Sequence, residues 1–434
     1  MSKSSTKGKG KMGYFEVAAI GIGGMVGGGI FAVLGLAVKL GKGGTPIAFA
    51  IAGIVALLTS YSYARLSVTF PSRGGTVKFL VKGLGGGLFT GGLNVLLWVS
   101  YVIMLALYSY AFGGYAASFF PEGSQMIMRH VFISAVMVGF TLLNSMGAKL
   151  VGEAEKWIVG IKLTILLAFV GVGSINISMA RLEPSAWSSF PTLLAGGMII
   201  FLGYEGFELM ANAAEDTKNA KKTLPRAFIS AVAFVIVLYI AISFVTVGNL
   251  PVNQIVSAKD YALAAAAEPV MGQMGFIIIA IAALLSTSSA INATLYSTAR
   301  VSYIIAKDGE LPEIMEKKVW KRPLEGLFIT AGFGLLVANI LDVSSISVMG
   351  SAGFLLIFAG VNYANFKLHR QTDSNRWVSL VGALVCIVAF AALIWHGASN
   401  ITHLYILAGM IGGSFLFEAL YRKISGRKAI ELKN

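Results

Sequence analysis

Long apolar stretches alternate with short polar segments along the whole chain. A hydrocarbon core about 30 Å thick is crossed by a helix of roughly 20 apolar residues. Stretches without any charged residue cover 17–38, 46–64, 84–121, 130–148, 227–258, 269–299 and 377–417. With weaker apolar runs included, the pattern predicts twelve spans, at 14–40, 46–70, 87–119, 127–147, 154–177, 191–213, 226–248, 272–305, 325–342, 345–368, 376–396 and 401–422.

Composition agrees with this pattern. Hydrophobic residues make up 56% of the 434 positions and charged residues only 12%, about half the share in a soluble domain. A water-soluble protein could not bury so much apolar surface in one core. The predicted fold class is therefore all-α integral membrane. The 51 glycines against 10 prolines favour closely packed membrane helices over a flexible linker.

The sequence contains no recognisable metal site or catalytic set. Cys386 is the single cysteine, and the four histidines are scattered without metal-ligand spacing. No motif combines a nucleophile with a base. We therefore predict no metal, no cofactor and no enzymatic activity.

The basic residues predict the orientation of the chain. A net charge of +14 could indicate nucleic acid, but Lys and Arg lie in short loops instead of on one face, so no nucleic-acid partner is predicted. Their excess on one side places both termini in the cytoplasm of a multi-pass cell-membrane protein. Residues 1–13 then form a basic cytoplasmic tail that could meet anionic lipid, and 423–434 a C-terminal tail. The opposite side carries Lys39, Lys42, Arg129, Arg181 and Lys259.

The first span carries the glycine-rich sequence GIGGMVGGGIF at 21–31. Each glycine costs about 1 kcal/mol inside a helix relative to alanine. One interpretation is close helix packing, because Gly23/Gly27 and Gly24/Gly28 form small-xxx-small pairs. The other is an unwound segment whose backbone groups line a polar cavity. The pattern does not satisfy a phosphate-binding loop, since Val26 stands where a third glycine is needed.

The sixth span carries FLGYEGFE at 201–208, where Gly203 and Gly206 flank Tyr204 and Glu205. Carboxylates are costly inside a membrane and usually face a cavity or a partner. Alternatively, Glu205 and Glu208 belong to the cytoplasmic end of the helix. Two glycine-interrupted spans, five helices apart, indicate a transporter with inverted repeats and a site near the midplane. The ends of broken helices would face an anionic group.

Lys162 lies about six residues beyond Lys156, or roughly 9 Å into the membrane. Its ammonium could return to the interface along a flexible stem. It could instead face the bundle interior, where desolvation would let it gain and lose a proton. In the eighth span, Ser286–Ser289, Asn292 and Thr294 form a polar cluster. These hydroxyls could bond their own i−4 carbonyls, bind sodium, or accept an ammonium.

The glycine-rich first span, FLGYEGFE with its trailer AAEDTKNAKKTLPRA, and SAINATLYSTARVSYIIAKDGELP resemble the amino acid–polyamine–organocation superfamily, most closely its archaeal proton-coupled, broad-specificity amino acid transporters. The resemblance covers most of the chain. It implies a LeuT-type fold with 12 transmembrane helices and discontinuous helices 1 and 6. Inverted repeats would cover 14–177 and 191–368, followed by peripheral helices over 376–422.

The resemblance also implies which residues form the sites. Lys162 would occupy the place of sodium in sodium-coupled relatives, near Gly23, Ser286 and Ser289. Glu208 matches an acidic position of the superfamily and is a second titrating candidate. The resemblance implies that backbone atoms of the first and sixth spans hold an amino acid; the substrate-binding candidates are Gly23, Gly24, Met25, Gly27, Gly28, Phe201, Gly203, Tyr204, Glu205 and Gly206.

The leading hypothesis is proton-coupled, sodium-independent uptake of amino acids by alternating access, with protonated Lys162 bridging two parts of the bundle. The rival is an exchanger or uniporter for cationic amino acids or polyamines, with Glu205 as counter-charge. The sequence offers no large extramembrane domain for a receptor and no filter-like repeat for a channel.

Overall fold

The structure is a computed structural model that describes residues 12–146, 151–312, 315, 324–397 and 401–425, with only the backbone described at 151–156 and 259. Most of the two predicted tails, 1–13 and 423–434, lies outside the described residues. Within the described ranges the regular elements are all helical. The α-helices are α1 (Tyr14–Gly41), α2 (Thr45–Thr69), α3 (Gly75–Leu84), α4 (Leu88–Ala117), α5 (Glu122–Met146), α6 (Val151–Gly173), α7 (Phe190–Ile200), α8 (Leu209–Asn212), α9 (Ala220–Asn249), α10 (Val252–Ala258), α11 (Ala262–Lys307), α12 (Leu324–Ile340), α13 (Val343–Lys367), α14 (Arg376–Gly397) and α15 (Ile401–Ser425).

Every predicted span coincides with helical structure. Among the described residues, ten helical stretches are long and apolar enough to cross a membrane. Two further apolar helices are shorter, at Trp157–Gly173 and Leu324–Ile340. The number of twelve spans therefore stays a prediction. The short helices α3 and α10 were not predicted, because neither is long enough to give an apolar run of membrane length.

The sixth span is interrupted, as predicted. The α-helix α7 ends at Ile200, a 3-10 helix η3 follows over Phe201–Glu208, and α8 resumes α-helical geometry at Leu209. A 3-10 stretch of eight residues is long, since such runs seldom exceed three or four residues. The chain thus changes its winding over FLGYEGFE without losing its helical path.

The predicted discontinuity of the first span is wrong in this structure. α1 runs without interruption from Tyr14 to Gly41. The glycines lie inside a regular helix because other backbone segments pack directly on them. Tertiary contact thus overrides their low helix propensity.

Two turns around α11 depend on glycine. Gly272 has φ of +67° and marks a kink, which coincides with the predicted start of the eighth span. At the other end, Gly309 has φ of +83°. Its N–H bonds the Ala306 carbonyl and the Glu310 N–H bonds the Ile305 carbonyl, which is the Schellman pattern of helix termination. This turn folds the chain after α11 back toward the bundle.

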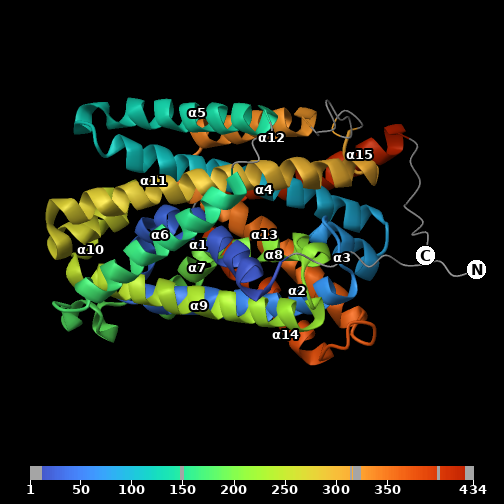
Figure 1. Ribbon diagram of the computed structural model, residues 1–434, viewed down its shortest axis with the longest axis horizontal. Coiled ribbons are helices and arrows are strands. Elements are labelled where there is room, and N and C mark those ends of the chain that lie inside the picture. Colours follow the sequence, from blue (N-terminus) through green and yellow to red (C-terminus); the bar gives the residue numbers. More distant parts are fainter. Residues whose placement is uncertain (1–11, 147–150, 313–314, 316–323, 398–400, 426–434) are drawn as a thin grey trace, which may run out of the picture.

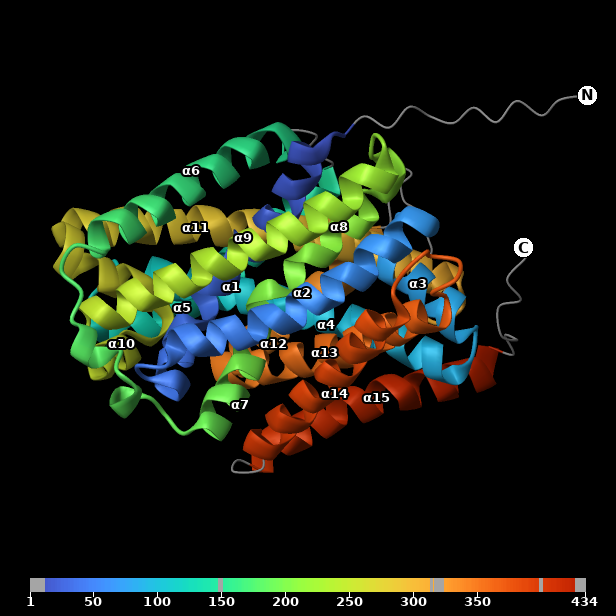
Figure 2. The same cartoon turned by 90° about the horizontal axis from the view of Figure 1, so that it is seen from below.

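The helices run roughly along the long axis of the molecule (Figure 1). α5 and α12 lie along one edge and α9 along the opposite edge, with α1, α7 and α8 between them. Turned by 90°, α6 lies at one edge and α14 and α15 at the other (Figure 2). α1, α4 and the sixth span are mostly buried, whereas α5 and α15 expose most of their apolar windows. The glycine-rich helix and the interrupted span therefore form the centre.

Candidate functional site

Lys162 points from α6 into the protein. Its side chain is 1% exposed, and Nζ donates a hydrogen bond to the carbonyl oxygen of Gly23 at 3.1 Å. The ammonium group therefore does not return along α6 to the membrane interface. A buried cation requires such acceptors, because its desolvation is costly. The structure brings Lys162 and Gly23 together; a role in proton coupling stays a prediction.

Ser286 of α11 bonds α1 one turn further along. Its hydroxyl donates to the carbonyl oxygen of Val26 at 2.7 Å, not to its own helix. Gly23 and Val26 are three residues apart, so their carbonyls lie on neighbouring turns of α1. Lys162 of α6 and Ser286 of α11 thus bond successive turns of α1.

Two other members of the polar cluster, Thr287 and Asn292, bond different partners from Ser286. Thr287 donates to the Ala283 carbonyl in its own helix at 2.7 Å, the local pattern common for hydroxyls in membrane helices. Asn292 accepts a hydrogen bond from Asn144 of α5 at 2.8 Å. Ser289 is half-buried on α11, and its part in a proton site stays a prediction.

Tyr239 of α9 joins α1 to η3. Its hydroxyl lies 2.7 Å from the Met25 carbonyl oxygen and 3.2 Å from that of Gly203. A buried tyrosine hydroxyl usually finds such a partner. Sequence reasoning missed Tyr239, since a single aromatic residue inside the apolar run 227–258 gives no sign of which carbonyl it meets.

The glycines of α1 and η3 allow the two backbones to touch. A methyl group on Gly24 would lie 2.8 Å from the Gly206 carbonyl oxygen, and one on Gly29 would lie 2.7 Å from the Cα of Gly203. Neither neighbour is a flexible side chain that could move away. This geometry bears out the close-packing interpretation of the glycine-rich sequence. Gly28 in turn lies against the ring of Tyr108.

Ser351 of α13 closes the junction between α7 and η3. Its hydroxyl donates to the Ile199 carbonyl at 2.7 Å and accepts from the Leu202 backbone N–H at 3.2 Å. A change of helix type leaves backbone groups without their regular partners, and one side chain here serves both sides of the change. Ser351 was also missed, because nothing in VMGSAGF predicts its position opposite the break.

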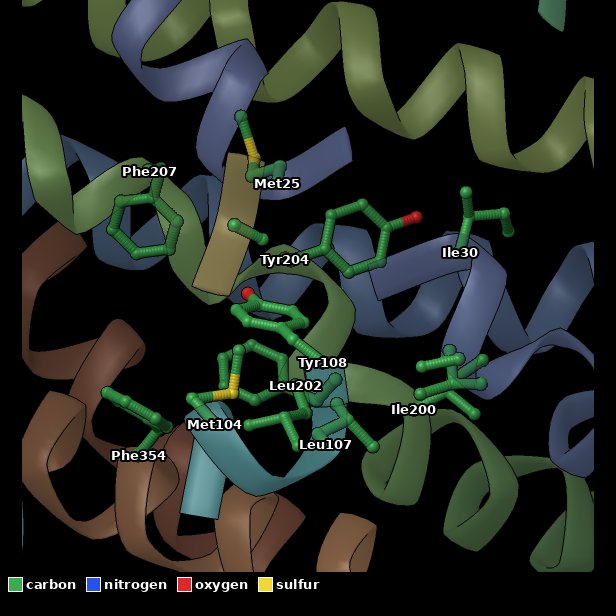
Figure 3. Close-up of a cluster of buried hydrophobic side chains, with 14 of the residues drawn as sticks. Met25, Ile30, Met104, Leu107, Tyr108, Ile200, Leu202, Tyr204, Phe207 and Phe354 are labelled. Atoms are coloured by element: carbon green, nitrogen blue, oxygen red, sulfur yellow. The ribbon is translucent and has the colours of Figure 1, made fainter. Parts of the chain in front are cut away.

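Three of the substrate-binding candidates lie in the hydrophobic centre. Met25, Phe201 and Tyr204 are all buried, and Figure 3 shows Met25, Tyr204 and Tyr108 in one cluster of buried side chains. The hydroxyl of Tyr204 donates to the Phe49 carbonyl of α2 at 3.0 Å. Tyr204 therefore anchors η3 to α2.

Glu208 is buried at the junction of η3 with α2 and α3. Its side chain is 1% exposed, and Oε2 accepts hydrogen bonds from Tyr63 at 3.1 Å and Thr76 at 3.0 Å. Glu208 is therefore buried and hydrogen-bonded, and whether it belongs to the cytoplasmic end of the helix stays a prediction. Tyr63 and Thr76 hold the carboxyl in one orientation.

Glu205 is buried one 3-10 turn earlier. Its side chain is 3% exposed, and Oε2 has no hydrogen-bond partner among the described residues. An unsatisfied buried carboxyl oxygen costs more than one that is paired. Oε1 of Glu208 is likewise buried without a partner among the described residues, so both glutamates of η3 keep an acceptor for a ligand or a proton. The remaining candidate, Gly27, packs against Ala290 of α11, where a methyl group would lie 3.0 Å from the Ala290 Cβ.

Residues 12–416 match the family model described as amino acid permease. The chain belongs to the amino acid permease family. It is a multi-pass membrane transporter, not an enzyme.

Relatives of this permease come from all domains of life. It is 36% identical over 407 residues to the inner membrane transport protein YbaT of Escherichia coli, covering 92% of this chain and 94% of that one. It is 35% identical over 421 residues to an uncharacterized protein of Methanocaldococcus jannaschii, covering 96% of both. A more distant relative is the chloroplastic cationic amino acid transporter 9 of Arabidopsis thaliana, 26% identical over 408 residues, or 88% of this chain and 71% of that one.

Proposed function

We propose that this permease takes up amino acids by proton-coupled, sodium-independent symport with alternating access. The observation that carries the proposal is the buried Lys162, whose Nζ bonds the Gly23 carbonyl. An ionisable side chain inside a membrane bundle is a functional-site hypothesis by default. Here it lies against the most glycine-rich helix of the chain.

Protonated Lys162 links α6 to α1 through the Gly23 carbonyl. The neutral amine keeps two N–H donors but loses the positive charge, so the hydrogen bond becomes roughly half as strong. Loss of the proton therefore loosens α1 from α6. Ser286 keeps its own bond to Val26 in either state. The protonation state of one side chain thus biases the position of α1, as coupling requires.

Amino acid binding is assigned to the contact between α1 and η3. The backbones of Gly24 and Gly206 touch there, so a small separation of the two elements exposes peptide groups. Because α1 is continuous at Gly24, the backbone groups that could bind a carboxylate or an ammonium are those of η3, where α-helical winding changes to 3-10 winding. Such a site recognises the carboxylate and ammonium groups that all amino acids share, and it would accept a broad range of side chains.

Polar contacts at the two ends of the bundle support alternating access. Near α10, Arg129 of α5 pairs with Asp260 at 3.0 Å. Near α3, Arg73 pairs with Glu215 at 3.4 Å. Figure 1 places α10 and α3 at opposite ends of the long axis. Opening either end would break one pair and leave the other intact.

The test is uptake of a labelled amino acid mixture into sodium-free proteoliposomes, with and without an inward proton gradient. We expect the gradient to drive accumulation above equilibrium. Lys162→Met keeps most of the stem but cannot titrate, so it should equilibrate substrate without concentrating it. Lys39→Met, at an exposed position of α1, is the matched control. Gradient-driven accumulation by Lys162→Met would overturn the coupling role.

The unpaired carboxyl oxygen of Glu205 favours a second candidate, an exchanger or uniporter for cationic amino acids or polyamines. Glu205 would then supply the counter-charge. Competition between neutral amino acids and arginine or spermidine separates the two functions. Selective loss of arginine binding in Glu205→Gln, with neutral substrates unaffected, would support the second.

A further inference from the structure

A second group of buried ionisable residues lies outside the candidate transport site, where α4, α15 and the turn after α11 meet. Glu310 is 2% exposed and Glu418 is 1% exposed. Asn94 of α4 donates to Glu310 Oε2 at 2.6 Å. Arg422 donates to Glu418 Oε1 through Nε and Nη2, at 3.0 and 2.7 Å.

The two carboxyl groups face the same side of α4. Glu310 bonds Asn94, and a methyl group built on Gly91 would clash with Glu418. Gly91 and Asn94 are three residues apart, so they lie on one face of the helix, one turn apart. Gly91 is needed because the carboxyl group of Glu418 fills the space beside it.

The charges in this group do not balance. Glu310 and Glu418 carry two potential negative charges, and Arg422 supplies one positive charge. Among the residues that the structure describes, the other nearby charged groups are Asp308, on the same turn as Glu310, and Lys78 and Lys307, which act on Asp308. α4 contributes Asn94 to the pocket. Within the described part of the chain, one negative charge is therefore left over among these buried groups, where isolated charge is strongly disfavoured.

Acceptor oxygens are also left without donors. Glu310 Oε1, Glu418 Oε2 and Asn94 Oδ1 are buried and have no hydrogen-bond partner among the described residues. All three are acceptors when both glutamates are ionised. A proton on Glu310 converts one of these acceptors into a donor for another and removes the excess charge. A single proton thus removes the charge imbalance and lowers the number of unmatched acceptors from three to one.

We propose that Glu310, Glu418, Asn94 and Arg422 form a proton-binding site, separate from Lys162, that fastens α15 and the turn after α11 to the start of α4. Glu310 carries the proton, because Glu418 is already paired with Arg422. Burial raises the pKa of Glu310 to about 7, so this site changes occupancy near neutral pH. The Schellman turn at Gly309 fixes the direction of Glu310 toward α4.

The direct test is infrared spectroscopy of the full-length protein across a pH titration. We expect the C=O stretch of a protonated carboxyl to disappear with a midpoint near neutrality. Glu310→Gln should lose the part of this component that Glu310 contributes, leaving any part from Glu205 and Glu208, while Glu268→Gln, an exposed glutamate of α11, should keep the whole component. A component of unchanged size and midpoint in Glu310→Gln would overturn the proposal.

Thermal unfolding gives an independent readout. Between pH 4.5, the ordinary pKa of glutamate, and about 7, the folded state holds a proton that the unfolded state has released. Stability contributed by Glu310 therefore falls as pH rises through this window. Glu310→Gln should have a flatter pH profile and a higher Tm than the parent above pH 7. Identical pH profiles would overturn the proposal.

Arg422→Gln tests the charge balance even where Glu310→Gln fails to fold. Removal of the cation should raise the midpoint of the titration, because the pair of glutamates then holds its proton more tightly. A midpoint that is unchanged or lower overturns the proposal. A saturable rise in Tm at high pH with sodium or potassium, and none with a bulky organic cation, would show that the site takes a metal cation instead.

Discussion

The Nζ atom of Lys162 lies 3.1 Å from the carbonyl oxygen of Gly23, and this hydrogen bond joins α6 to the centre of the molecule. Lys162→Ala removes the charge-assisted bond and leaves a cavity. Hydrogen bonds to charged groups contribute about 1.5–3 kcal/mol, so we expect a clear fall in Tm. Lys39→Ala, at an exposed position, should change Tm little. Equal effects would show that Lys162 has no structural importance.

Ser351 is expected to stabilise the break in the sixth span. Ser351→Ala removes the donor to Ile199 and the acceptor for Leu202, and each unsatisfied buried group costs about 1–3 kcal/mol. Ser347 is the matched control: it lies on the same helix, is fully buried, and its Oγ has no partner among the described residues. Thermal denaturation should show a large loss for Ser351→Ala and little or no loss for Ser347→Ala. The reverse order would contradict this assignment.

Tyr239→Phe removes only the hydroxyl that meets the Met25 and Gly203 carbonyls. A neutral hydrogen bond contributes about 0.5–1.5 kcal/mol, so a modest fall in Tm is expected. Tyr296→Phe, at a position 55% exposed, should be neutral. Because Tyr239 joins α1 to η3, its loss should also alter the transport rate; an unchanged rate would place Tyr239 outside the moving parts.

Gly24→Ala should disrupt the contact between α1 and η3. The added methyl group would meet the Gly206 carbonyl oxygen at 2.8 Å, and overpacking costs about 1–3 kcal/mol. Gly171→Ala in α6 has no atom within 4 Å of the new methyl group. There the change should stabilise by about 0.5–1 kcal/mol. Tm and uptake, measured on both variants, check the contrast; tolerance of Gly24→Ala in both assays would contradict the close contact.

Much of the fold could be predicted from the sequence, because apolar runs of membrane length are a strong signal. The position of the sixth-span break also follows from local sequence, and the predicted start of the eighth span coincides with the kink at Gly272. The continuity of α1 does not. A glycine-rich helix is compatible with unwinding or with close packing, and the choice depends on Gly203 and Gly206, far away in the chain.

The candidate site was predictable in part. The depth of Lys162 in the membrane marked it as unusual. The direction in which its side chain points depends on the Gly23 carbonyl of another helix. Ser351, Tyr239 and the two partners of Glu208 all lie within helices, at positions whose local sequence has no distinctive pattern. Such contacts arise from how helices meet, which periodicity within one helix does not encode.

The 3-10 winding of η3 affects the length of the sixth span. A 3-10 helix rises about 2.0 Å per residue and an α-helix about 1.5 Å. Over the eight residues Phe201–Glu208, a return to α-helical winding would shorten the span by about 4 Å. It would also turn the two flanking helices relative to each other, since each residue then advances by about 100° instead of about 120°. A change between 3-10 and α-helical winding in η3 would therefore both shift and rotate α7 relative to α8. The sixth span would stay helical during this change.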